Sequence, residues 1–128
     1  MLFDTDVLIW VLRGSRQAAA AIDAAPARFV SIVNYMELIQ GARDRKELAG
    51  IKKFLSGYFD TLPLTENTGH RAAIYIEEYG ISSGMRLADA LIAATAVEHC
   101  IPVCTGNVKH YKIVKELEIV QFKKTGKG

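Results

Sequence analysis

The chain begins MLFDTDVLIW (residues 1–10), and this stretch places two aspartates, Asp4 and Asp6, inside the first apolar run. The apolar residues that start at Leu2 predict a short buried strand ending at Asp4. A carboxylate beside an apolar core costs free energy unless another group compensates its charge. The place of Asp4 therefore raises the question of which groups elsewhere in the chain meet it.

Length and composition favour one domain. The chain has 128 residues, half of them apolar, and a net charge of +2, which is compatible with a nucleic-acid partner but too small to indicate one. We expect a single domain over residues 1–122 and a basic, flexible tail at 123–128. Cys100 and Cys104 are too few for a disulfide scaffold, and no stretch is apolar enough to cross a bilayer. These features predict a soluble, cytoplasmic protein with no membrane partner.

Short apolar segments alternate along the chain with helical patterns. The expected strands cover residues 2–4, 28–33, 59–64, 101–105 and 118–122. Ser15 and Thr65 are expected to cap helices, while Gly14 and Gly80 are expected to end them. The alternation predicts an α/β fold with a mainly parallel sheet, in which ligands bind at the carboxyl ends of the strands. Asp4 lies at such an end.

Polar residues that follow strands or begin helices are the candidates for the partner of Asp4. They are Glu37, Asp89 and Asn107, which converge with Asp4 if the strands are parallel. Two carboxylates about 4 Å apart repel by about 4 kcal/mol at an effective dielectric constant of about 20, and a bound cation relieves this repulsion. Oxygen ligands favour Mg²⁺ or Mn²⁺ over zinc. Such an ion activates water and neutralises charge, as phosphodiester hydrolysis requires.

Each of these acids also has a structural interpretation. Asp6 is expected to cap the first helix rather than to touch a metal. Glu37 closes a capping box if its helix is capped at Asn34, and has no capping role if the helix begins at Ser31. Asp89 gains from the positive end of its helix dipole. Asp4 is the acid that these local roles explain least well, because it ends an apolar strand.

Four motifs, taken in order and with their spacing, resemble the PIN-domain nucleases, and in particular the VapC-type ribonuclease toxins. They are LFDTDVLI, SIVNYMELIQG, LADALIAATA and CTGNVKHY, and the resemblance covers residues 2–122. The resemblance implies a three-layer α/β/α fold with a central parallel sheet of about five strands. It also implies metal-dependent cleavage of RNA, a homodimer, and an antitoxin partner that blocks the site.

The resemblance also assigns roles to residues. Asp4, Glu37 and Asp89 match the three catalytic, metal-binding acids of the family, while Asp6 and Thr105 match supporting polar positions. The chain departs from many members at the fourth acidic position, where Asn107 offers a neutral oxygen. We therefore expect one Mg²⁺ or Mn²⁺ ion, held by Asp4 and Asp89, and a second ion only together with RNA phosphate.

Basic side chains near the acids are expected to hold RNA phosphates. The candidates, which lie in or beside the motif segments, are Arg13, Arg86 and Lys109, with Arg43 as a further possibility. For any one of them, a solvated helix face is the simpler interpretation.

Three other interpretations remain open at this stage. The DTDVL segment fits the signature of haloacid-dehalogenase-like phosphatases, but no late acidic pair follows the fourth strand. A receiver domain needs a lysine and a proline after a late strand, and Pro102 instead follows Ile101. A non-catalytic, RNA-binding PIN domain is the third. The cysteines and histidines from His99 to His110 match no common zinc spacing. We expect Cys100 and Cys104 to be small buried residues and His110 to be a surface residue.

Overall fold

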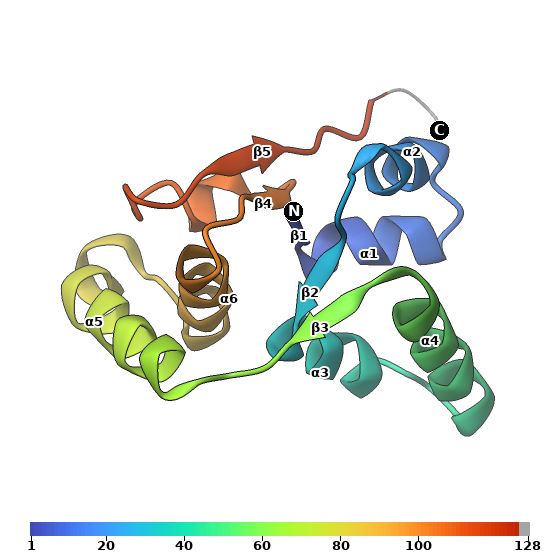
Figure 1. The fold of residues 1–128 in the computed structure, drawn as a ribbon, viewed down its shortest axis with the longest axis horizontal. Helices are drawn as coiled ribbons and strands as arrows, with labels where there is room; N and C mark the ends of the chain where they lie inside the picture. The colour runs from blue at the N-terminus through green and yellow to red at the C-terminus, as the bar shows by residue number, and fades with distance from the viewer. Residues whose placement is uncertain (126–128) are drawn as a thin grey trace.

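The computed structural model describes residues 1–125 and contains a five-stranded parallel sheet (Figure 1). The strands are β1 (Leu2–Phe3), β2 (Phe29–Ser31), β3 (Asp60–Leu62), β4 (Val103–Thr105) and β5 (Ile119–Gln121). Their order is β3-β2-β1-β4-β5, and all neighbouring strands run parallel. The chain order reverses between β1 and β4, which creates a crevice at the carboxyl ends of these two strands. The predicted parallel sheet of about five strands is confirmed.

The described residues form six α-helices, which are divided between two layers, one on each face of the sheet (Figure 1). They are α1 (Thr5–Leu12), α2 (Arg16–Ala24), α3 (Ile32–Gln40), α4 (Arg45–Tyr58), α5 (Glu66–Ser83) and α6 (Leu87–Glu98). Successive side chains of a strand point to opposite faces. Accordingly, Leu2 joins the core under α5 and α6, while Phe3 joins the core under α1, α2 and α4. The predicted three-layer α/β/α fold is confirmed.

Alanines allow α6 to lie close to the sheet. Ala90, Ala93 and Ala94 are fully buried in the same core as Leu2 of β1. Asp89 stands in the first turn of this helix, next to Ala90. Small side chains thus bring the first turn of α6, and Asp89 with it, towards the end of β1.

The start of α3 decides between the two interpretations of Glu37. Ser31 caps α3: its hydroxyl accepts a hydrogen bond from the Asn34 backbone, and the Asn34 side chain accepts one from the Ser31 backbone. This is a capping box between Ser31 and Asn34. The capping box between Asn34 and Glu37 is therefore wrong, and Glu37 lies in the second turn with its side chain available for other contacts. The second strand is shorter than predicted because the helix begins at Ile32.

Two local features differ from the sequence prediction. Helix α5 continues through Gly80 to Ser83 and ends at Gly84, whose φ of 67° is left-handed. Gly80 shows no such backbone conformation, so it does not end the helix. A short 3₁₀ helix, η1 (Val108–His110), was not predicted; it follows β4 and carries Lys109 and His110.

The last described residues lie against the first helices. Thr125 exchanges hydrogen bonds with Gln17, and the Lys124 ammonium lies 4.5 Å from the centre of the Trp10 ring. The rest of the predicted tail, residues 126–128, lies outside the described residues. Within the described part of the chain, no helix is long and apolar enough to cross a membrane.

Candidate metal-dependent nuclease site

The crevice at the ends of β1 and β4 opens into a cavity of about 810 Å³. Its lining includes the expected acids, the expected amide ligand and two of the expected basic residues. The acids are Asp4, Asp6, Glu37 and Asp89, the amide is Asn107, and the basic residues are Arg86 and Lys109. Thr105 lies behind Asp4 and is fully buried. Arg13 lines a neighbouring cavity of about 790 Å³ together with Arg43, and Glu37 lines both cavities.

Asp4 is only 6% exposed, and its carboxylate accepts three hydrogen bonds. Its Oδ1 accepts from the backbone N–H of Thr5 at 2.9 Å and from Nδ2 of Asn34 at 3.3 Å. Its Oδ2 accepts from the Thr105 hydroxyl at 2.8 Å. A carboxylate has about four lone-pair positions, and these bonds engage three of them. At most one position, on Oδ2, is left for a cation, and the Tyr111 hydroxyl also lies beside this carboxylate.

Thr105 links Asp4 to the loop after β4. Its hydroxyl donates to Asp4 and accepts the backbone N–H of Asn107 at 3.0 Å. The Asn107 side chain forms no cap of η1, and Asn107 lines the cavity. Thr105 therefore fixes the backbone of Asn107 relative to Asp4.

Asp6 does not cap α1, contrary to the sequence prediction, because the helix already begins at Thr5 and its cap is Asp4. Asp6 instead bridges two segments: its Oδ1 accepts from the Val7 backbone at 2.9 Å, and its Oδ2 accepts from the Gly106 backbone at 2.8 Å. A Cβ atom at residue 106 would lie 2.6 Å from Asp6 Oδ2, so the close approach requires glycine there. Burial, followed by the charge of Asp4, raises the pKa of Asp6.

Glu37 is connected to Asp4 through two residues that the sequence analysis missed. The Thr5 hydroxyl donates to Glu37 Oε1 at 2.6 Å, and Asn34 Nδ2 donates both to Thr5 Oγ1 at 2.9 Å and to Asp4. Asn34 is fully buried, whereas Glu37 is exposed at the rim of the cavity. The capping signal at Ser31 and Asn34 was visible in the sequence, but it carried no information about the carboxylates that Asn34 also contacts.

The pKa of Asp89 depends on burial and on two charged neighbours, His110 and Asp4. Burial raises the pKa of Asp89, the charge of nearby His110 opposes this shift, and the charge of Asp4 adds to it. His110 Nδ1 lies 4.0 Å from Asp89 Oδ2. His110, expected to be a surface residue, is exposed but stands at this cavity.

Burial and the negative charges of the cavity together raise the pKa of two side chains, Tyr111 and Cys104. Burial, and then the charges of Asp4 and Asp89, raise the pKa of the Tyr111 hydroxyl, and Glu37 contributes as well. Burial, with Asp6 and Asp4, raises the pKa of the Cys104 thiol to about 11. The acids therefore act on one shared region even though they come from three segments of the chain. Tyr111 was also missed, because nothing in its sequence neighbourhood indicates this contact.

The donor set fits a hard divalent cation. It consists of carboxylate and amide oxygens, and Asp6 and Asp89 are shifted towards their neutral forms when no cation is near. Among residues 1–125, no three histidine, cysteine, aspartate or glutamate side chains form a group already spaced to hold an ion. The carboxylates share the cavity without being closed around a common point, so binding an ion requires side-chain adjustment.

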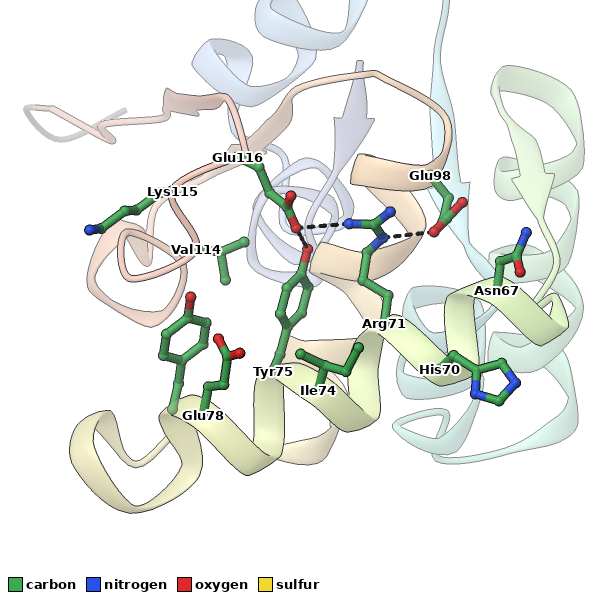
Figure 2. Close-up of a pocket in the computed structure, with 11 residues that line it drawn as sticks. Asn67, His70, Arg71, Ile74, Tyr75, Glu78, Glu98, Val114, Lys115 and Glu116 are labelled. Atoms are coloured by element: carbon green, nitrogen blue, oxygen red, sulfur yellow. Dashed lines mark hydrogen bonds and ion pairs between the residues drawn. The ribbon is translucent and has the colours of Figure 1, made fainter.

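A second polar cavity lies apart from the acidic one and shares no lining residue with it (Figure 2). It has a volume of about 680 Å³ and is formed by α5, the end of α6 and residues 114–116. Arg71 lies between two glutamates, with Nε 2.7 Å from Glu98 and Nη1 2.9 Å from Glu116, and the Tyr75 hydroxyl donates to Glu116. Both glutamates of this group are therefore paired with the same guanidinium.

The comparisons with known proteins agree with the fold. The sequence model of the PIN domain matches residues 1–116. The chain belongs to the PIN-domain family of nucleases and to its VapC-type branch. Ribonuclease VapC10 of Mycobacterium tuberculosis is 35% identical over 126 residues, which cover 92% of this chain and 90% of that protein. The family resemblance predicted from the motifs is confirmed, and the phosphatase and receiver-domain alternatives receive no support.

Two solved structures show the same architecture. A toxin–antitoxin complex from Klebsiella pneumoniae contains a chain with 29% identity and a TM-score of 0.79, over 93% of this chain and 94% of that chain. DNA-bound VapBC from Salmonella typhimurium contains one with 20% identity and a TM-score of 0.80, over 94% and 96%. At 20% identity the second comparison supports the fold alone.

Proposed function

We propose that this chain is the toxin of a toxin–antitoxin pair and cleaves RNA phosphodiester bonds with a bound Mg²⁺ or Mn²⁺ ion. The observation that carries the proposal is the Asp4 carboxylate: it is buried, held by three hydrogen bonds, and lines a cavity that Asp89 and Glu37 also line. The similarity to Ribonuclease VapC10 supports RNA as the substrate.

Roles for the individual residues follow from their placement. Asp4 and Asp89 would hold the ion, and Glu37 and Asn107 would complete the site or take part in a second one. The ion, when bound, lowers the pKa of a water molecule and neutralises charge on the phosphate. Asp6 and Thr105 keep the loop after β4 aligned with Asp4. Arg86 and Lys109, exposed at the cavity, would hold neighbouring phosphates, and Arg13 would extend this contact into the adjacent cavity.

The partners follow from the relatives. The Klebsiella protein was solved as a toxin–antitoxin complex, so we propose a cognate antitoxin for this chain, and also a homodimer in the cytoplasm. The domain would span residues 1–122.

Cleavage of labelled RNA tests the proposal directly. Purified protein is incubated with structured RNA in Mg²⁺, in Mn²⁺, and in excess chelator, with single-stranded DNA of the same sequence as a control. We expect cleavage of RNA that chelator abolishes and that added Mn²⁺ restores. RNA binding without cleavage in either metal would instead support the non-catalytic PIN-domain alternative.

A further inference from the structure

We propose that Ser31, Asn34 and Thr5 form a directed hydrogen-bond relay in which Asn34 and Thr5 position two of the acids, Asp4 and Glu37, for metal binding. The proposal rests on the proposed function, because it concerns how the same site is held. It assigns Asn34 and Thr5 as positioning residues, which act on the ion through the carboxylates that they contact.

The orientation of the Asn34 amide is fixed by the backbone. The Ser31 N–H can only donate, and it lies 3.0 Å from one side-chain atom of Asn34, which must therefore be Oδ1. The Ser31 hydroxyl lies 2.7 Å from the same atom. The amide nitrogen consequently faces Asp4 Oδ1 at 3.3 Å and Thr5 Oγ1 at 2.9 Å. Asn34 then makes all four hydrogen bonds open to an asparagine side chain, and it is fully buried.

The direction of the Thr5 hydroxyl follows from that of Asn34. Thr5 Oγ1 accepts a hydrogen from Asn34, so its own hydrogen is available to Glu37 Oε1, 2.6 Å away. A short bond from a hydroxyl to an ionised carboxylate is of the strong, charge-assisted kind. The relay therefore runs in one direction, from the cap of α3 to Thr5 in the first turn of α1, and supplies donors to both carboxylates.

The consequence for metal binding comes from the oxygens that the relay occupies. It uses Oδ1 of Asp4 and Oε1 of Glu37. Oδ2 of Asp4 keeps at most one lone pair, and within residues 1–125 no hydrogen bond engages Oε2 of Glu37. The relay thus occupies one oxygen of each acid, and the second oxygens, Oε2 of Glu37 and the remaining lone pair of Asp4 Oδ2 beside the Thr105 bond, are the candidates to bind the ion. Outer hydrogen bonds of this kind commonly change metal affinity by about 10- to 100-fold when they are removed.

The two ends of the relay provide matched variants. Thr5→Val keeps the shape of the side chain and removes the donor to Glu37, while Thr5→Ser keeps the hydroxyl. Ser31→Ala removes the hydroxyl that caps α3 but leaves the Ser31 N–H bound to Asn34 Oδ1, so the amide stays oriented. Loss of the cap alone should lower stability and leave metal affinity unchanged, whereas loss of a positioning donor should lower metal affinity at a comparable loss of stability.

Calorimetric titration of Mn²⁺ into each protein, combined with metal-free thermal unfolding, tests the relay without RNA. We expect Thr5→Val to weaken Mn²⁺ binding by about tenfold and to melt several degrees lower, because the buried Asn34 amide also loses an acceptor. Thr5→Ser should bind Mn²⁺ within about twofold of the wild type. Ser31→Ala should melt several degrees lower and keep its Mn²⁺ affinity within about twofold. Asn34→Ala should show both losses; if it does not fold, the comparison of Thr5→Val with Ser31→Ala still decides.

The possible failures are distinguishable. If the wild type binds Mn²⁺ and Thr5→Val binds it equally well, the relay is overturned while the proposed function stands. Equal loss of affinity in Thr5→Val and Ser31→Ala would also overturn it, because the effect would then come from the fold. A wild type that binds no Mn²⁺ overturns the proposed function itself.

Discussion

The two polar cavities hold similar carboxylates in opposite electrostatic situations. Around Arg71 (Figure 2), hydrogen bonds from Tyr75 and then from Arg71 lower the pKa of Glu116. In the acidic cavity, burial and the charge of Asp4 raise the pKa of both Asp6 and Asp89. In the first group a guanidinium contacts the carboxylates. Arg86 and Lys109 line the second cavity, but among the described residues neither forms an ion pair with Asp4, Asp6 or Asp89.

We expect this difference to separate a cluster that stabilises the fold from one that serves the proposed function. Within residues 1–125, no lysine or arginine forms an ion pair with Asp4, Asp6 or Asp89; the basic side chain that lies within 4.0 Å of one of them is His110, near Asp89. Carboxylates gathered without a counter-ion destabilise the fold, so such an arrangement is understandable where a ligand supplies the charge. The Arg71 cluster should matter for stability alone, and the acidic cavity for metal binding and catalysis.

The largest effect should come from Asp4→Asn. The amide oxygen can still accept from Thr5 and Asn34, and the Thr105 hydroxyl can turn to accept from the new NH₂ group, so the fold should survive. The negative charge at the ion is lost, which should remove several kcal/mol of transition-state stabilisation, or on the order of 10³-fold in cleavage rate. Single-turnover RNA cleavage measures this, with circular dichroism as the check of folding. Cleavage at the wild-type rate would show that Asp4 does not bind the ion.

Arg71→Met should have the opposite profile. Removing the guanidinium leaves Glu98 and Glu116 without a cation, at a cost of about 1–2 kcal/mol of stability, since the group is partly exposed and screened. RNA cleavage per folded molecule should not change. Urea denaturation together with cleavage assays measures both, and Lys115→Met, at an exposed residue of the same cavity, is the control. Loss of cleavage in folded Arg71→Met would mean that this cavity also serves the reaction.

Asn107→Asp should sharpen the contrast by adding charge to the acidic cavity. An extra carboxylate near a divalent ion should tighten Mn²⁺ binding by roughly tenfold after screening, whether or not cleavage becomes faster. Asn67→Asp adds the same charge to the Arg71 cavity and should leave Mn²⁺ affinity unchanged. Calorimetry of both variants tests the pair. An unchanged affinity in Asn107→Asp would show that residue 107 does not face the ion.

The sequence predicted the layers of the fold because each element carries its own local signal. Leu2 and Phe3 form a strand, the alanines before and after Ile92 mark a buried helix face, and polar residues follow the strands. Gly80 misled the prediction because a glycine inside a helix and a glycine that ends one look alike until φ is known; the left-handed residue is Gly84.

The connections within the site were harder to predict. Asn34 reaches Asp4 across 30 residues, and Arg71 reaches Glu116 across 45. The place of Asn34 at a helix start is already explained by its part in the cap. Its second contact, with a distant carboxylate, therefore could not be predicted from the sequence. The acids themselves could be proposed because strand ends in a parallel sheet share one edge.

The smallest expected effect concerns Asp89→Asn in the metal-free protein. The folded-state pKa of Asp89 is raised, so its ionised form is less favourable in the folded than in the unfolded chain. Asparagine removes this penalty and should raise stability at pH 7 by about 1 kcal/mol. The wild type recovers the same free energy as the pH falls through the raised pKa towards the usual value of about 4, so the difference between the two proteins should shrink over that window. Urea denaturation in chelator at pH 7 and at pH 4.5 measures it, with Asp23→Asn, an exposed site, as the control. An Asp89→Asn protein that is less stable at pH 7 would mean that the interaction of Asp89 with the dipole of α6 outweighs its repulsion from Asp4.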